Sequence, residues 1–224
     1  VKGNHDRGGH FEALSFSSPP HPLIRISRVG PILLFLLNSE ATDEDAKTAV
    51  DSLLADLESL SSEWSLRAQK AQRILFRVWA QHRPLWSGGN HGTDQRQWKR
   101  WLVPALERLN IDLMLAGHDH DYERFCPSLG IDKERRCDRH GITYIVSGGG
   151  ASVTVPLPDL AWRERPQQRH QNQSQRVHFS DSPHHLTIKV LNDHLVIQAW
   201  GTTHYGQREL FDEHNIPARD YPLS

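Results

Sequence analysis

Residues 111–120 read IDLMLAGHDH, an apolar run that ends at a glycine and is followed by two histidines with one aspartate between them. The run Ile111–Ala116 is typical of a buried strand. Gly117 lets the backbone bend tightly as it leaves that strand, so His118 and His120 can face the same side of an extended turn. Such a pair can hold one metal ion from two sides or reach two ions about 3.5–4 Å apart. The alternative is a pair of solvated loop histidines that bond to neighbouring carboxylates.

Two other segments also place ligand-type side chains just past an expected strand. Residues 3–6 read GNHD, and His82 follows an apolar run. Because α/β sheets build their sites at the carboxyl ends of their strands, we expect the three segments to meet. The Asn4 carbonyl oxygen is a neutral metal ligand, His5 can approach a substrate, and Asp6 can orient that imidazole. A polar turn at residues 3–6 and a structural role for His82 are the alternatives.

The rest of the chain alternates strands with helices and then closes with strands. Residues 43–60 carry apolar side chains at three- and four-residue steps, which is typical of a helix that Thr42 or Asp43 caps. Similar patterns predict a helix at 95–109 and strands at 23–26, 32–37, 74–80, 142–146, 186–191 and 195–200, the last two as a hairpin. Residues 156–183 are rich in Pro, Gln, Arg and Ser without a period, and we interpret them as a long loop or insertion. This order predicts one α/β domain over residues 1–224, a layered sandwich of mixed β-sheets flanked by helices.

Composition and charge exclude several classes of protein. Of the 224 residues, 37% are hydrophobic and 24% charged, so the chain is not of the intrinsically disordered class. No apolar run reaches the roughly 20 residues of a membrane span. Twenty-six basic and 27 acidic side chains leave a formal net charge of −1, which argues against bulk binding to nucleic acid. Fifteen histidines against two cysteines indicate that a metal site would use imidazole, amide and carboxylate ligands.

Taken together and in this order, the three segments resemble the motifs of the calcineurin-like metallophosphoesterase superfamily, and most closely those of its purple acid phosphatase branch. The stretches that carry the resemblance are GNHD at 3–6, HRPLWS at 82–87 with Gly92 closing the following loop, GHDHDYER at 117–124 and ITYIVSGGG at 142–150. The resemblance implies a metallophosphoesterase-like fold and a hydrolase that acts on a small phosphorylated substrate.

The resemblance also implies a dinuclear metal centre. Asn4, His82 and His118 would bind the more exchangeable ion, and His120 would reach the other. The two ions would be divalent or of mixed valence, with iron paired with zinc, manganese or iron. Two cations neutralise phosphoryl oxygens and lower the pKa of a bound water, so that a metal-activated hydroxide can attack a phosphomonoester. A phosphodiester or nucleotide substrate stays open.

Three further residues would act on the substrate. By the resemblance, His5 would face the scissile phosphoryl group as general acid or transition-state stabiliser, with Asp6 orienting it. His91, in the loop after His82, lies where members of the family often carry a substrate-facing histidine.

The match to the family is incomplete at its beginning. In the family, an Asp-x-His pair and a Gly-Asp motif precede the GNHD segment and supply carboxylate ligands, one of which bridges both metals. Only Val1 and Lys2 precede Gly3. We therefore expect the chain to lack the N-terminal part of the domain, and this piece to be weakly active or inactive because two adjacent cations need carboxylates to balance their charge. The alternative is a degenerate module that binds one ion or none and serves in binding or structure.

Cys126 and Cys137 flank a polar stretch that we interpret as a loop, and they form either a disulfide or two free thiols. Members of the family that the chain resembles are commonly exported, which favours the disulfide and a secreted or periplasmic location. The first residues carry no export signal. We expect residues 122–124 to anchor this loop, with Glu123 or Arg124 pairing locally; a substrate contact of Tyr122 is the alternative. Asp119 and Asp121 are expected to orient neighbouring groups or to face solvent.

Overall fold

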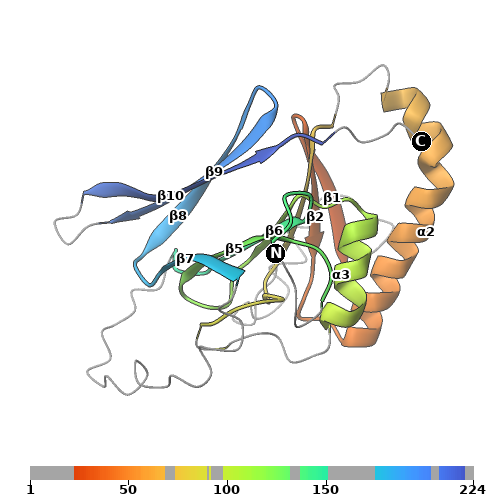
Figure 1. Cartoon of the computed structure of the whole chain (residues 1–224). Helices are drawn as coiled ribbons and strands as arrows, with labels where there is room; N and C mark the ends of the chain where they lie inside the picture. The colour runs from red at the N-terminus through yellow and green to blue at the C-terminus, as the bar shows by residue number, and fades with distance from the viewer. Residues whose placement is uncertain are drawn as a thin grey trace, which may run out of the picture.

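The computed structural model describes residues 23–68, 74–89, 91, 98–131, 137–150, 175–202 and 207–219, without the side chains of residues 58–68. In this part of the chain two helices and ten strands form (Figure 1). In chain order they are β1 (Ile24–Val29), β2 (Ile32–Leu37), α2 (Asp43–Ala68), β3 (Phe76–Gln81), α3 (Trp98–Arg108), β4 (Leu113–Ala116), β5 (Tyr122–Ser128), β6 (Ile142–Ser147), β7 (Arg176–Ser180), β8 (His184–Leu191), β9 (His194–Thr202) and β10 (Arg208–Pro217).

Seven strands form one mixed sheet in the order β1-β2-β3-β4-β6-β5-β7. Strands β2, β3, β4 and β6 run parallel, so their carboxyl ends lie at the same edge. Strand β1 is antiparallel at one side, and β5 and β7 are antiparallel at the other. Parallel neighbours need a crossover connection, and α2 and α3 lie in two of these, β2 to β3 and β3 to β4. Both helices cover the same face of the sheet (Figure 1).

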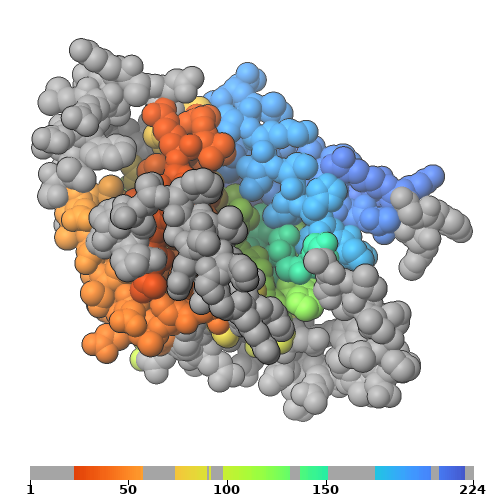
Figure 2. All heavy atoms as spheres, turned by 180° about the vertical axis from the view of Figure 1, so that it is seen from behind, coloured from red at the N-terminus to blue at the C-terminus, as the bar shows by residue number. Residues whose placement is uncertain are grey.

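The other face of the large sheet packs on a three-stranded antiparallel sheet of order β10-β9-β8. The molecule therefore has three layers, with an apolar core on each side of the large sheet. Figure 2 shows from behind that the first strands, in red, lie next to the C-terminal strands, in blue. The first core holds Phe35, Trp79, Trp98 and Leu102 among others, and the second holds Phe76, Val78, Leu195 and Ile197.

Every predicted element that falls within the described residues forms, with shifts at its ends, whereas the strand end expected before Asn4 lies outside them. Thr42 caps α2 as one of the two predicted capping residues, because its Oγ1 accepts the Asp45 N–H at 3.1 Å. Helix α2 runs to Ala68, eight residues beyond the predicted end at Leu60. Helix α3 begins at Trp98, and residues 95–97 of the predicted helix lie outside the described residues.

Three strands were not predicted: β5, β7 and β10. The interpretation of residues 156–183 as a loop was wrong for Arg176–Ser180, which is β7, while residues 156–174 lie outside the described part of the chain. The placement of Cys126 in a loop was also wrong, because this residue lies on β5. All three strands are rich in charged or polar residues, so they lack the continuous apolar run that marks the central strands.

Cys126 on β5 is bridged to Cys137, which confirms the favoured disulfide. Ser128 and Cys137 form an isolated bridge between backbone segments beside it. The loop between the two cysteines is thus closed at its base. Of the two helices that the structure describes, neither combines the length and the apolar character needed to cross a membrane.

Candidate functional site

Histidines follow the carboxyl ends of two neighbouring parallel strands. His82 follows β3, and His118 and His120 follow β4, which pairs with β3. His118 Nδ1 lies 3.2 Å from His82 Nε2, and the ring centroids of these residues are 5.0 Å apart. The Gly117 N–H donates to the His82 carbonyl at 3.0 Å, which joins the two loops at their bases. Two segments 36 residues apart in the sequence therefore meet at the edge where α/β sheets build their sites.

His91 lies on the loop that follows His82 and turns back over the same cluster. Its ring centroid is 4.3 Å from that of His118 and 6.4 Å from that of His120. The His91 side chain is exposed to solvent. The structure thus brings together four of the seven predicted site residues, while Asn4, His5 and Asp6 lie outside the described residues.

The loop after β2 holds the backbone on both sides of His82. The buried Ser39 Oγ accepts the N–H of His82 at 3.1 Å and that of Arg83 at 3.0 Å. Glu40 and Arg83 form a two-pronged ion pair, with N···O distances of 2.8 and 3.0 Å. Ser39 and Glu40 were not among the predicted site residues. The rule that sites form at the carboxyl ends of parallel strands would have found them, because they follow β2, a third parallel strand at the same edge.

His118 has an unusual backbone conformation and a low proton affinity. Its φ of 71° lies in the left-handed region, where a non-glycine residue costs about 1–3 kcal/mol and is common at functional sites. Burial, followed by the charges of His91, Arg83 and His82, lowers the pKa of His118 from 6.5 to about 4. The imidazole is therefore neutral at neutral pH and keeps a lone pair that a metal ion can use.

The donor set fits part of the metal centre that the resemblance of the motifs implies. Two nitrogens bound at about 2.0–2.1 Å to one tetrahedral ion lie about 3.3 Å apart, so the 3.2 Å between His82 Nε2 and His118 Nδ1 suits two ligands of one ion. Among the residues that the structure describes, no group of three or more His, Cys, Asp and Glu side chains is arranged to hold an ion. A full coordination shell would need further ligands, such as the predicted Asn4.

Three acidic side chains lie buried beside the histidines: Asp119, Asp121 and Glu123 are 0%, 8% and 0% exposed. Glu123 accepts the Gly88 N–H at 2.9 Å and a bond from Arg176 at 2.8 Å. Burial nevertheless raises the pKa of Glu123. Asp121 Oδ1 has no hydrogen-bond partner within the described ranges. Burial, followed by the charges of Glu123 and Asp119, raises the pKa of Asp121 to about 8, so this group holds a proton at neutral pH.

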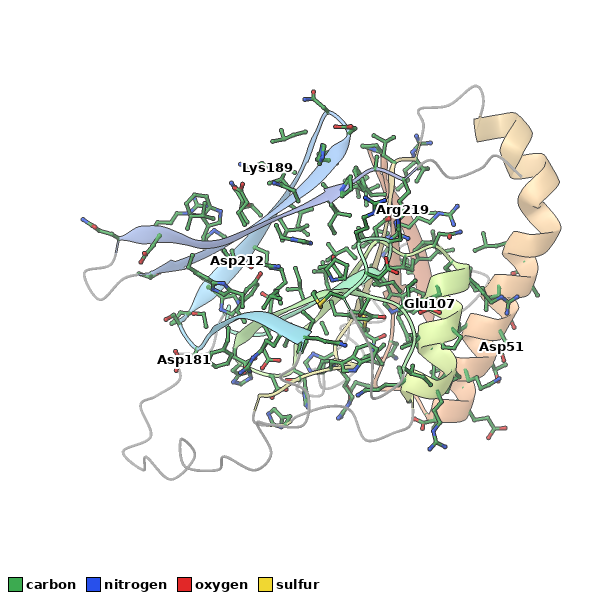
Figure 3. All side chains as sticks on the ribbon, in the orientation of Figure 1. Asp51, Glu107, Asp181, Lys189, Asp212 and Arg219 are labelled. Carbon is green, nitrogen blue, oxygen red and sulfur yellow. A yellow bond between two sulfur atoms is a disulfide. The ribbon has the colours of Figure 1, made fainter. Side chains whose placement is uncertain are left out.

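A second buried network connects the two sheets next to the site. Tyr122 donates to Asp212 at 2.6 Å, and Arg124 donates to both carboxylate oxygens of Asp212 at 2.7 and 2.8 Å. Asp212 on β10 lies between the two sheets (Figure 3). The expectation that residues 122–124 pair locally was therefore wrong, because their partners come from β7 and β10, 53 to 90 residues away.

The glycines after β6 pack directly on the turn that carries His118. A Cβ placed on Gly148 would lie 2.0 Å from the Asp119 carbonyl oxygen, so only glycine permits this approach. The buried His184 packs on Gly149 and bonds beside it, with Nδ1 at 2.8 Å from the Ser182 carbonyl and Nε2 at 3.1 Å from Ser147 Oγ. Since a carbonyl only accepts, Nδ1 carries the proton and Nε2 accepts from the serine hydroxyl.

No family model matches the sequence, and no curated protein matches it either. Solved structures do match. GAP50, described as the anchor in the inner membrane complex of Plasmodium, superposes with a TM-score of 0.57 at 14% identity, covering 89% of this chain and 55% of its own. Purple acid phosphatase PPD1 from yellow lupin (Lupinus luteus) seeds superposes with a TM-score of 0.59 at 16% identity, covering 93% of this chain and 35% of its own.

These matches concern the fold. The chain spans about half the length of GAP50 and about a third of the lupin phosphatase. The chain has the calcineurin-like metallophosphoesterase fold, an α/β sandwich with a mixed sheet, as the resemblance of its motifs implies.

Proposed function

We propose that the protein is a metal-dependent phosphoesterase that hydrolyses a small phosphomonoester at the histidine cluster. One observation carries the proposal: His82, His91, His118 and His120, which come from two loops, converge at the carboxyl edge of the parallel strands. The chain shares its fold with purple acid phosphatase PPD1, and this likeness supports hydrolysis of a phosphoester as the reaction.

In this proposal, His82 and His118 with Asn4 would hold one ion and His120 would contribute to a second. Divalent or mixed-valence ions, iron with zinc, manganese or iron, would supply charge for the phosphoryl oxygens and a lower pKa for a coordinated water. The neutral His118 imidazole is ready to bind without losing a proton first. Ser39 fixes the His82 backbone, so the two nitrogens are held in place before any ligand enters.

His91 and the predicted His5 would act on the substrate itself. His91 is exposed and stands 4.3 Å, ring to ring, from His118, so it can donate a hydrogen bond or a proton to a group placed beside that residue. Arg83 carries a positive charge next to the cluster, but Glu40 holds it, so we assign it to the support of the loop. A phosphodiester or a nucleotide would need the same groups. The substrate class is therefore identified by comparing the turnover of these compounds.

We also propose that the protein works in an oxidising, exported compartment, either secreted or periplasmic. The Cys126–Cys137 disulfide supports this location, because such bridges persist outside the reducing cytosol.

The test measures metal binding and hydrolysis on the same 224-residue chain. Zn²⁺ and Mn²⁺ are titrated by calorimetry, and turnover of a generic phosphomonoester is followed with each ion. We expect His82→Ala and His118→Ala to weaken Zn²⁺ binding at least about tenfold and to abolish any turnover that the wild type shows. His140→Ala is the control, because His140 is exposed and bonds to Arg139 outside the cluster. Binding and turnover that survive both cluster substitutions would refute the proposal.

A second function, a non-catalytic binding module, has its own support. Within the described ranges no three-ligand metal group exists, and GAP50, which shares the fold, is described as an anchor. A wild-type chain that binds one ion or none and hydrolyses neither a phosphomonoester nor a phosphodiester with any of the ions would favour this reading over the enzyme.

A further inference from the structure

The loop that carries His91 is tied at several points to the segment that carries His118. Ser87 Oγ donates to Asp119 Oδ2, and the His91 N–H donates to Asp119 Oδ1 at 2.7 Å. The Gly88 N–H donates to Glu123. One carboxyl group, that of Asp119, therefore fixes both the start and the end of the stretch 87–91.

The space around these bonds leaves little freedom. Ser87 is 2% exposed and Asp119 is fully buried. A Cβ placed on Gly89 would lie 2.5 Å from Asp119 Cγ and 2.7 Å from Asp121 Oδ2, so the loop crosses directly over these carboxyl groups. The Gly89 N–H donates in turn to Ser87 Oγ at 3.0 Å. The approach at Gly89 therefore requires a residue without a side chain, and Asp119 accepts hydrogen bonds from residues on both sides of this glycine.

We propose that Asp119 is the positioning residue for His91: it holds the His91 backbone so that the imidazole stands against His118. The inference rests on the proposed function for its catalytic meaning, but the geometry is separate from it. Asp119 sits between two predicted ligands and bonds to neither ring, and both of its oxygens are directed to the opposite loop. Its part in hydrolysis is to place the group that meets the leaving oxygen of the substrate.

A purely structural role would give a different pattern of effects. The His82 backbone is held by Ser39 and Gly117, not by Asp119. Loss of the Asp119 carboxyl should therefore release His91 while the spacing of the His82 and His118 nitrogens persists. Turnover should fall through kcat, and the affinity for a metal ion should stay the same.

The first test is independent of activity. Amide hydrogen exchange at His91 is measured in wild type, Asp119→Ala and Asp119→Asn. We expect about tenfold faster exchange in the alanine variant, because the His91 N–H loses its acceptor, and recovery in the asparagine variant, whose side-chain oxygen can still accept. Asp138→Asn is the matched control, because Asp138 accepts the N–H of His140 in the same way but away from the site. Unchanged exchange at His91 in Asp119→Ala would overturn the proposal.

The second test uses turnover and Zn²⁺ affinity. Asp119→Ala should lower kcat about a hundredfold, as expected for a misplaced reacting group, with the Zn²⁺ dissociation constant unchanged within about twofold. The double variant with His91→Ala should be no slower than His91→Ala alone, and additive losses would contradict the positioning role. If the wild type shows no hydrolysis with any ion, the proposed function fails while the exchange result still decides the position of His91.

Discussion

Substitution of Gly148 by alanine should displace the turn that carries His118. The new Cβ would lie 2.0 Å from the Asp119 carbonyl oxygen and 2.9 Å from its carbonyl carbon, whereas real contacts are at least 3.0 Å. The turn or the glycine segment must therefore move by about 1 Å. Overpacking of this kind costs about 1–3 kcal/mol in the free energy of unfolding. A shift of about 1 Å at His118 should also weaken Zn²⁺ binding about tenfold, because it changes the spacing of the His82 and His118 nitrogens.

Urea unfolding and Zn²⁺ titration measure both effects, and Gly150→Ala is the matched control. A Cβ on Gly150 would meet only the His184 carbonyl oxygen, at 3.6 Å, which is an ordinary contact. Its free energy of unfolding should stay within about 0.5 kcal/mol of wild type. A Gly148→Ala variant with the stability and the Zn²⁺ affinity of Gly150→Ala would show that the glycine segment does not support the His118 turn.

Three further predictions concern the scaffold. Reduction of the Cys126–Cys137 bridge, 11 residues apart, should lower the free energy of unfolding by about 3 kcal/mol, measured by urea unfolding with and without reductant. Asp212→Ala should cost about 3–5 kcal/mol because Arg124 loses its buried partner, and a thermal melt unchanged from wild type would contradict this. Burial, aided by Arg124, lowers the pKa of His214 from 6.5 to about 4, so the unfolded chain takes up a proton that the folded chain does not, and stability should fall as pH drops from 6.5 to 4. His214→Gln should flatten that decline in urea unfolding across the same range.

The central strands could be predicted because their sequence records burial on both faces. Strands β2, β3, β4 and β6 are apolar runs in a parallel sheet covered by helices on one face and a second sheet on the other. Strands β5, β7 and β10 could not be found in this way. Charged side chains on β5 are buried there because partners arrive from elsewhere: Glu123 meets Arg176, and Arg124 meets Asp212. A local pattern contains no sign of a partner 53 or 88 residues away.

The candidate site also has a part that could be predicted from the sequence and a part that could not. That His82 and His118 approach each other could be predicted from one rule, the meeting of parallel strand ends at one edge. His91 could be placed only through the resemblance to a family, because nothing in its loop sequence fixes the path back over His118. The path depends on hydrogen bonds from backbone N–H groups to Asp119 and Glu123, and backbone donors are the same in every sequence.

The segment after Gly117 carries both the histidines of the cluster and the carboxyl groups that hold the 87–91 loop. His118, in its left-handed turn, and His120 lie 4.3 and 6.4 Å, ring to ring, from His91, while Asp119 and Glu123 accept hydrogen bonds from the loop. A buried carboxyl group is costly unless its oxygens accept hydrogen bonds. The N–H groups of His91 and Gly88 meet this need for Asp119 and Glu123, and the same hydrogen bonds fix the path of the loop. Asp121, between them, has an oxygen without a partner among the described residues and keeps its proton, so the acidic face holds the loop without gathering three negative charges beside the site.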